Sequence, residues 1–328
     1  MKAGIVGAGF MGGTHAAGWA ETEATIAGFA DSDLASAQSL ANRYKAKAYP
    51  SLEAMLNDVD VVDICAPTHL HHALALQAAA AGKDIICEKP LARTVEDAQE
   101  MIAVCRDANV KLLVAHVVRF FPEYAKAKAA VAEGQIGQPA VLRLTRGAFR
   151  PKKPVDNWFT DFEKSGGMML DLMIHDFDYA RWIAGEVESV FAKNIASAHP
   201  NAPVDHGLVI LKHRSGAISH VEGSWAYPPP IFRTRIEIAG SDGWLEFDSD
   251  KSAAIDLHLR QQQNDAPDVP LPGSPLSESP YTTQLKAFYN ALLNNVPPPI
   301  TAQDGLAALQ IALAAIESAQ RGKAIFIQ

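Results

Sequence analysis

A glycine-rich turn near the start of the chain constrains its fold more than any other feature. Residues 7–12 read Gly-Ala-Gly-Phe-Met-Gly, the pattern G-x-G-x-x-G, between an apolar run at Ala3–Val6 and a helical pattern over Met11–Ala20. In this pattern the glycines allow a tight turn, a close approach of a pyrophosphate and tight packing of helix on strand. The amides at the helix N-terminus then receive the negative charge. The turn predicts a dinucleotide site that includes Gly7, Gly9, Phe10, Met11 and Gly12.

Asp31 indicates which dinucleotide the site takes. It follows the second predicted strand, Thr25–Phe29, and lies 19 residues after Gly12. A carboxylate at this point accepts hydrogen bonds from a free ribose 2'-hydroxyl and repels a 2'-phosphate, and the adjacent Ser32–Leu34 offers no arginine. We therefore expect NAD rather than NADP. The alternative, a glycine-rich turn without any ligand, explains the glycines but not Asp31.

The first 120 residues alternate short aliphatic runs with alanine-rich amphipathic stretches. This alternation is typical of a parallel sheet covered by helices on both faces. We expect a doubly wound Rossmann domain over residues 1–120. Its predicted strands are 3–6, 25–29, 61–65, 84–87 and 111–115, and its predicted helices are 11–20, 34–44, 70–81 and 95–107.

The pattern changes after Phe120, where consecutive extended runs replace the alternation. Strands without intervening helices imply an antiparallel or mixed sheet, and we expect a second α/β domain with an open mixed, largely antiparallel sheet over residues 121–328. A proline-rich stretch cannot join such a sheet and predicts a surface loop at 265–280. The predicted strands are 187–196, 207–213, 217–225, 234–239 and 244–247, and the predicted helices are 123–133, 167–184, 282–293 and 302–320.

Composition limits the classes of partner. The 29 Lys and Arg residues against 37 Asp and Glu give a net charge of -8, which argues against broad attraction to nucleic acid or to an anionic membrane. The three cysteines, Cys65, Cys87 and Cys105, are too few and scattered for a disulfide framework or a metal cage. We expect a cytoplasmic protein with neither nucleic-acid nor membrane partners.

Two further turns follow predicted strands at the edge where ligands of such sheets bind. Ala66–His72 follows one strand and Glu88-Lys89-Pro90 follows the next. Because ligands lie beyond the carboxyl ends of parallel strands, both turns are expected to line the nicotinamide. His69, His71 and His72 suggest zinc, but no cysteine or H-E-x-x-H pattern accompanies them, so we expect no metal. The predicted cofactor contacts here are Pro67, Thr68, His71, Glu88 and Lys89.

One helix of the second domain combines an apolar composition with a polar stripe. The predicted helix 167–184 is hydrophobic nearly all round, which indicates burial, yet Asp171, His175 and Asp178 share one face at spacings of four and three. Buried ionisable groups must be paired or face a polar cavity. A structural Asp/His network that anchors the helix is the alternative to a catalytic site.

Several motifs together resemble the Gfo/Idh/MocA family, named for glucose-fructose oxidoreductase and inositol 2-dehydrogenase. They are the run 4–15, the triplet Glu88-Lys89-Pro90, the segment 165–182 with Asp171 and His175, and the run 237–246. The resemblance covers essentially the whole chain. It implies a Rossmann domain, a C-terminal domain whose open sheet often forms an oligomer interface, and a catalytic trio of Lys89, Asp171 and His175.

The expected chemistry follows from what the oxidation of a secondary alcohol requires. As hydride leaves carbon for the nicotinamide, a base must accept the hydroxyl proton, and His175 titrates in a suitable range. The Lys89 ammonium would stabilise the charge that develops on the oxygen, and Asp171 would orient His175 or hold a neighbouring hydroxyl. Lys89 as the base is an open alternative.

The family placement suggests, less specifically, which residues face the substrate. Polar groups beside aromatic rings suit a sugar or a cyclic polyol. The basic stretch 143–153 could bind an anionic substrate, although a charged strand edge is the favoured interpretation. The predicted substrate contacts are Lys89, His116, Arg119, Tyr124, Asp156, Trp158, Asp171 and His175.

We therefore expect an NAD-dependent dehydrogenase or reductase of a sugar, sugar derivative or inositol, which assembles as a homodimer or homotetramer through its C-terminal sheet. One alternative is a glycosidase of the same fold that oxidises and re-reduces its substrate on a retained NAD. Another is a non-catalytic sensor of NAD or sugar. Retention of Lys89, Asp171 and His175 argues against the sensor.

Overall fold

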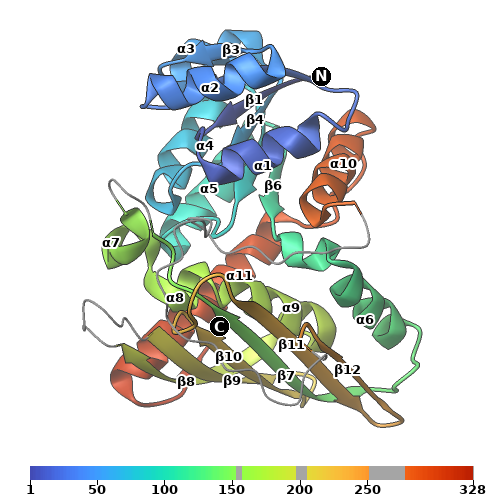
Figure 1. Ribbon diagram of the computed structural model, residues 1–328. Coiled ribbons are helices and arrows are strands. Elements are labelled where there is room, and N and C mark those ends of the chain that lie inside the picture. The colour runs from blue at the N-terminus through green and yellow to red at the C-terminus, as the bar shows by residue number, and fades with distance from the viewer. Residues whose placement is uncertain (153–156, 197–204, 251–277, 328) are drawn as a thin grey trace. The chain divides into compact units, whose positions relative to one another are not determined.

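The computed structural model describes residues 1–152, 157–196, 205–250 and 278–327. These residues form two compact units (Figure 1). The first unit contains residues 1–120 and 163–165 together with residues 278–309 from late in the chain, and the second unit contains the other described residues.

A parallel sheet is the centre of the first unit. In the described part of this unit six strands lie in the order β3-β2-β1-β4-β5-β6, and every neighbouring pair is parallel. This is the strand order of the dinucleotide-binding fold, in which the order reverses between β1 and β4. The predicted Rossmann class is confirmed. The strands are β1 (Lys2–Val6), β2 (Thr25–Ala30), β3 (Lys47–Tyr49), β4 (Val61–Ile64), β5 (Asp84–Glu88) and β6 (Leu112–Ala115).

Helices cover this sheet, including one from late in the chain. Every residue of the central strand β4 is buried, as expected of a strand covered on both faces, and every residue of β6 at the end of the sheet is buried as well. The late helix α10 (Pro280–Leu293) packs against α1 (Phe10–Trp19), where Leu285 lies over Gly18. The other helices of this unit are α2 (Leu34–Tyr44), α3 (Leu52–Met55), α4 (His71–Ala80), α5 (Val95–Asp107), and the 3-10 turns η1 (Leu56–Asp58), η2 (Thr68–Leu70) and η3 (Val117–Phe120).

The second unit is built on a mixed sheet. Its seven described strands lie in the order β12-β11-β7-β10-β9-β8-β13, and all neighbours are antiparallel except β7 and β10. The predicted open mixed, largely antiparallel sheet is thus confirmed. The strands are β7 (Pro139–Ala148), β8 (Val187–Ala196), β9 (Asp205–His213), β10 (Ile218–Ser224), β11 (Phe232–Gly240), β12 (Trp244–Asp248) and β13 (Ile325–Phe326).

One face of this sheet is buried beneath helices. Along β9, Val209 and Leu211 are fully buried while Leu208 and Ile210 are exposed, the period-two pattern of a sheet with one covered face. The buried face contacts α8 (Gly167–Asp171) and α9 (Ile174–Ala184), behind the strands in Figure 1. The remaining helices of the chain are α6 (Pro122–Ala132), η4 (Trp158–Thr160), α7 (Phe162–Ser165) and α11 (Ala302–Arg321).

Several sequence predictions differ from the structure. The predicted single helix 167–184 is broken between α8 and α9, where the Met173 amide bonds to the Met168 carbonyl, five residues back, instead of four. β3 was missed because its three residues carry no visible alternation. The basic stretch was expected on a strand edge, but β7 is flanked by β10 and β11. Most of the predicted loop 265–280 lies outside the described residues.

Within the described residues, none of the helices combines the length and the hydrophobicity needed to cross a lipid bilayer.

Candidate active site

The three glycines of the N-terminal turn meet different steric demands. Gly7 has a φ of 96°, and a Cβ built on it would lie 2.6 Å from the Cys65 carbonyl oxygen. A Cβ on Gly12 would lie 1.9 Å from the Gly7 oxygen, so the backbone itself requires glycine there. A Cβ on Gly9 would meet nothing within 4 Å. The fold therefore needs Gly7 and Gly12, whereas Gly9 leaves space open beside the turn.

That open space lies at the start of α1, and it fits a dinucleotide pyrophosphate. Gly9 is the N-cap residue of α1 and has no side-chain capping hydrogen bond, and the first turn of the helix contains no acidic residue. The neighbouring Phe10 is exposed and Met11 is half-buried. The amides at this end of α1 are thus available to an anion, and no carboxylate within the first turn opposes one.

Asp31 lies directly after β2, beside the glycine turn. Its Oδ2 accepts a hydrogen bond of 2.7 Å from the Ala8 amide, and its Oδ1 accepts one of 2.8 Å from the Asp33 amide. The side chain is half-buried, so the carboxylate is held in place and still reaches solvent. This is the position from which an acidic residue holds the ribose of NAD.

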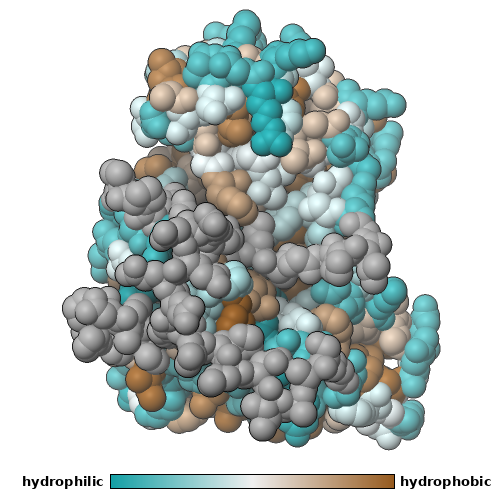
Figure 2. Space-filling view, in the orientation of Figure 1, coloured by the Kyte–Doolittle hydropathy of each residue, from teal (hydrophilic) through white to brown (hydrophobic). Residues whose placement is uncertain are grey.

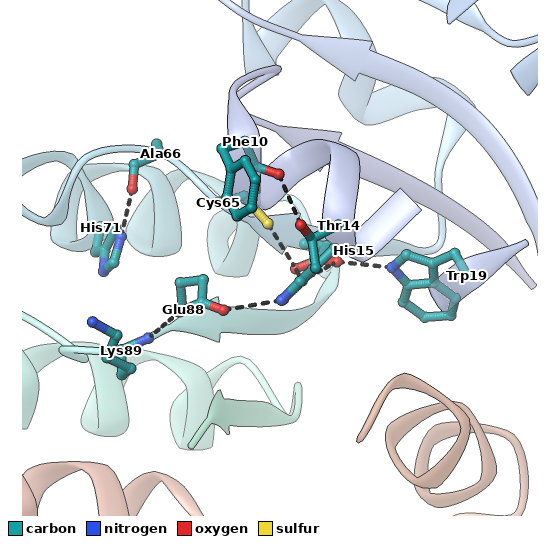
Figure 3. A network of polar contacts seen from close by, with 10 residues as sticks. Phe10, Thr14, His15, Trp19, Cys65, Ala66, His71, Glu88 and Lys89 are labelled. Atoms are coloured by element: carbon teal, nitrogen blue, oxygen red, sulfur yellow. Dashed lines mark hydrogen bonds and ion pairs between the residues drawn. The ribbon is translucent and has the colours of Figure 1, made fainter. Parts of the chain in front are cut away.

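The turn after β4 is tied to the turn after β5 by His71. The imidazole is buried, with Nδ1 2.8 Å from the Pro90 carbonyl oxygen. Its Nε2 is 2.9 Å from the Ala66 carbonyl oxygen (Figure 3). Burial lowers the pKa of His71, which its two backbone hydrogen bonds oppose. Pro67 is half-buried and Thr68 is buried in the same turn. His71 thus braces the two turns that were predicted to line the cofactor.

Lys89 is singled out by its exposure. All residues from 85 to 92 are buried except Lys89, which is half-buried at the carboxyl end of β5. The Lys89 amide donates a hydrogen bond of 3.1 Å to Oε2 of the preceding Glu88. The strand end therefore carries one half-buried lysine in an otherwise buried segment.

A buried polar network lies behind Lys89, and the sequence analysis missed it. His15 Nδ1 is 2.9 Å from Asp63 Oδ2 and His15 Nε2 is 2.9 Å from Glu88 Oε1, while the Trp19 indole donates to Asp63 over 2.8 Å (Figure 3). Burial alone would lower the pKa of His15, but the Asp63 carboxylate raises it well above its ordinary value. One available signal was an aspartate inside the apolar strand β4, because a buried carboxylate needs a partner.

In the second unit, Asp171 and His175 are singled out in the same way as Lys89. All residues from 168 to 180 are buried except these two, which are half-buried and one helical turn apart across the junction of α8 and α9. Asp178, the third member of the predicted stripe, is fully buried. The structure thus separates the stripe into two half-buried residues and one core residue.

A buried ion pair, also missed from sequence, anchors α9 to the sheet. Arg146 of β7 donates to both carboxylate oxygens of Asp176, over 2.7 and 3.0 Å, and its third contact is the Tyr124 hydroxyl at 3.1 Å. Both side chains of the pair are almost fully buried. Arg146 is therefore a core residue whose charge is paired within the protein.

Arg143 lies on the exposed side of β7, with Glu237 of β11 3.9 Å away. Acidic residues therefore do accompany the basic stretch in the fold.

The other predicted substrate contacts occupy varied environments. His116 is fully buried just after β6, and Arg119 is buried with its guanidinium 3.4 Å from Asp304. Tyr124 is buried against Tyr179, and Trp158 stacks on Phe159 with ring centroids 4.0 Å apart. Asp156 lies outside the described residues. A substrate contact by any of these residues stays a prediction.

The strand order, the glycine turn and Asp31 together define a protein of the NAD-binding Rossmann class.

The particular family follows from comparison with known proteins. Residues 1–116 match the family model described as an oxidoreductase family with an NAD-binding Rossmann fold, and residues 124–246 match the GFO/IDH/MocA C-terminal domain. The chain belongs to the GFO/IDH/MocA family of oxidoreductases. The predicted family, enzyme class and NAD cofactor are confirmed.

Two relatives named as inositol dehydrogenases match the whole chain. The myo-inositol 2-dehydrogenase of Thermotoga maritima is 31% identical over 100% of this chain and 99% of its own, and the inositol 2-dehydrogenase of Rhizobium meliloti is 31% identical with the same coverage. Among solved structures, a levoglucosan dehydrogenase in complex with NADH and levoglucosan is 26% identical with a TM-score of 0.84, and covers 100% of this chain and 99% of that one.

Proposed function

We propose that the protein transfers hydride between NAD and a secondary alcohol carbon of a sugar, a sugar derivative or an inositol. The observation that carries the proposal is the selective exposure of Lys89, Asp171 and His175 from segments that are otherwise buried. The substrate class comes from relatives named for inositol, levoglucosan, D-apiose and 1,5-anhydro-D-fructose. All four are polyhydroxylated compounds or their ketone counterparts.

In the proposed reaction the three half-buried residues act on different parts of the chemistry. His175 accepts the hydroxyl proton, and in the reductive direction it returns the proton to the oxygen. The Lys89 ammonium donates a hydrogen bond to the reacting oxygen and stabilises the charge that develops there. Asp171, one helical turn before His175, orients the imidazole or holds a second hydroxyl of the substrate. NAD supplies the hydride acceptor when it is bound.

We propose NAD as the preferred dinucleotide on the strength of Asp31. The carboxylate lies beside the glycine turn and would accept hydrogen bonds from a free 2'-hydroxyl. The phosphates would lie at Gly9 and the amides of the first turn of α1. Pro67, Thr68, Glu88 and the backbone of Lys89 would then border the nicotinamide.

We also propose that a second copy of this chain covers the exposed face of the C-terminal sheet, giving a homodimer or homotetramer. Phe191 of β8 and Ile210 of β9 are opposite each other in register, and both are exposed together with Ile195, Leu208 and Ile218. Figure 2 shows brown, hydrophobic residues at the surface in the part of the view where Figure 1 draws these strands. An apolar group of this kind on adjacent strands is typical of a subunit interface.

A cytoplasmic location is proposed because the three thiols favour a reducing compartment. Cys87 and Cys105 are buried and Cys65 is half-buried, so all three would persist as thiols there.

The test of the proposed reaction is a panel of inositols, aldoses, anhydrosugars and sugar acids, each incubated with NAD and with NADP. Absorbance of the reduced nicotinamide is followed while the ketone product is quantified. The proposal predicts reduced cofactor and ketone in equal amounts, with NAD preferred. Release of an aglycone from a glycoside without net reduction of NAD would favour the glycosidase instead. Binding of NAD without turnover of any compound would favour the sensor.

A further inference from the structure

His15 has an environment that the proposed reaction does not use directly. It lies in α1, three residues after Gly12, and its side chain is completely buried. Both ring nitrogens face carboxylates: Nδ1 is 2.9 Å from Asp63 and Nε2 is 2.9 Å from Glu88 (Figure 3). One imidazole thus joins the cofactor helix to residues on two strands, β4 and β5.

The two contacts determine the protonation state of the ring. A neutral imidazole carries one N–H group and can donate to only one of the two carboxylates, whereas an imidazolium donates to both. The other groups around it are the Trp19 indole, which donates to Asp63, and the Cys65 thiol, which is neutral because burial raises its pKa. The contacts of both ring nitrogens with carboxylates thus favour a buried imidazolium at His15, and the Asp63 carboxylate raises the His15 pKa in the same direction.

The network continues to Lys89 through the Glu88 carboxylate. Oε1 of Glu88 accepts from His15, and Oε2 accepts from the Lys89 backbone amide over 3.1 Å. Glu88 is itself buried, so both carboxylate oxygens depend on these protein donors. The orientation of the Glu88 carboxylate is coupled through this pair of bonds to the backbone from which the Lys89 side chain extends.

We propose that His15 is a positioning residue for Lys89: its imidazolium fixes the Glu88 carboxylate, which in turn holds the Lys89 backbone at the carboxyl end of β5. This inference rests on the proposed function, in which Lys89 acts on the substrate oxygen. The glycine turn leads into α1, and His15 lies on the same helix. The position of Lys89 would therefore be coupled to the helix that follows the glycine turn.

A metal site is the competing interpretation. Donor atoms of His15, Asp63 and Cys65 all lie within 4.8 Å of one another. However, the His15 nitrogens lie at hydrogen-bond distances from carboxylate oxygens, and one of those carboxylates also accepts from Trp19. Metal ligation would require His15 to be neutral and Cys65 to be a thiolate, against the charges argued above.

Two substitutions of His15 separate its two contacts. The amide nitrogen of Asn lies near the position of the imidazole Nδ1, so His15→Asn keeps the bond to Asp63 and loses the one to Glu88. The longer His15→Gln places its amide nitrogen near the position of Nε2 and keeps the bond to Glu88. We expect His15→Asn to lower kcat by about 10²-fold, the cost of a small misplacement of a catalytic group. His15→Gln should lose much less, with NAD affinity and substrate KM little changed in both.

The measurements are steady-state kinetics, NAD binding by calorimetry, circular dichroism at the assay temperature and metal content of the purified protein. His72→Gln is the matched control, since His72 is paired with the exposed Glu100 over 2.8 Å and should keep full activity. Glu88→Gln tests the same link without altering α1 and should lower kcat even if both His15 variants fail to fold.

Several results would overturn the proposal. Equal kcat values for His15→Asn and His15→Gln, or a full kcat for Glu88→Gln, would show that the Glu88 contact does not position Lys89. A stoichiometric metal that is lost in both His15 variants would establish the metal site instead. The proposed function has its own test, because full turnover by Lys89→Ala would remove Lys89 from the chemistry whatever the His15 variants do.

Discussion

At the glycine turn, Gly9 and Gly12 belong to one motif but differ in what surrounds them. A side chain at Gly12 would strike the backbone of Gly7, whereas one at Gly9 would enter open space. Sequence alone predicted the turn, because the motif, the strand and Asp31 occur at the expected spacing. The motif assigned Gly7 to the tight turn, Gly9 to the approach of the pyrophosphate and Gly12 to close packing of the helix. It could not predict the atoms that make glycine necessary, such as the Cys65 carbonyl beside Gly7, because they belong to other segments.

This difference predicts that an alanine at Gly9 affects NAD binding, whereas an alanine at Gly12 affects thermal stability. Gly9→Ala should leave thermal stability unchanged but weaken NAD binding by about tenfold or more, because the added methyl group would occupy the pyrophosphate position. Gly12→Ala should lower the melting temperature, since the backbone must move. Thermal unfolding with and without NAD measures both effects. Normal NAD affinity in Gly9→Ala would contradict the placement of the phosphates.

His15 predicts a pH dependence of stability. Its pKa in the folded protein is raised well above 6.5 by Asp63, although burial opposes the shift. The imidazolium therefore contributes stability that is fully present below its ordinary pKa and is lost as the pH rises through the raised folded value. The difference in unfolding free energy between the native protein and His15→Gln should therefore shrink as the pH rises above the ordinary histidine value of about 6.5. Chemical denaturation at several pH values checks this, and a difference that grows with pH would contradict it.

At the scale of elements, the predicted strands and helices of the first unit agree with the structure to within a few residues, because long periodic segments carry a strong signal. The junction between α8 and α9 was not predicted, since hydrophobic residues continue through it from Met168 to Phe177. The bounds of β7 were not predicted, because Arg143 and Arg146 interrupt its apolar pattern. The partner of Arg146 is Asp176, which lies 30 residues later, so no local pattern connects them.

Loss of either partner of the buried ion pair between Arg146 and Asp176 should destabilise the second unit. Replacing one partner leaves a buried charge uncompensated, at a cost of about 3–5 kcal/mol. We expect Arg146→Met to lower the unfolding free energy by this amount. The double variant Arg146→Met with Asp176→Leu should be more stable than either single variant, because no unpaired charge is left. Denaturant titration of the native protein, both single variants and the double variant measures the unfolding free energies. A double variant whose loss equals the sum of the two single losses would contradict the account.

At the scale of the whole molecule, the order of the chain does not follow the two units. Residues 278–309 return to the first unit after the second sheet is complete, and α10 packs on α1. Sequence patterns predict elements and not such returns, because the contact between Leu285 and Gly18 joins distant parts of the chain. The exposed sheet face was predictable only in outline, from alternation along strands such as β9.

Assembly through the sheet predicts a specific effect of charge on that face. Ile210→Lys places an ammonium among apolar side chains and should shift the protein from dimer or tetramer to monomer. Leu293→Lys is the matched control, because Leu293 is an exposed leucine on α10, which belongs to the first unit and not to the C-terminal sheet. Light scattering coupled to size-exclusion chromatography gives the mass of each. An unchanged mass for Ile210→Lys, or a monomeric native protein, would contradict the interface.

The central claim is hydride transfer from a carbon of a polyhydroxylated substrate to NAD, and isotope transfer measures it most directly. The best substrate from the panel is deuterated at its ring carbons and incubated with the protein and NAD, and the reduced cofactor is analysed by mass spectrometry. The account predicts one deuterium in each reduced nicotinamide, and no labelled cofactor with Lys89→Ala under the same conditions. Reduced nicotinamide without deuterium, or equal labelling by Lys89→Ala, would contradict it.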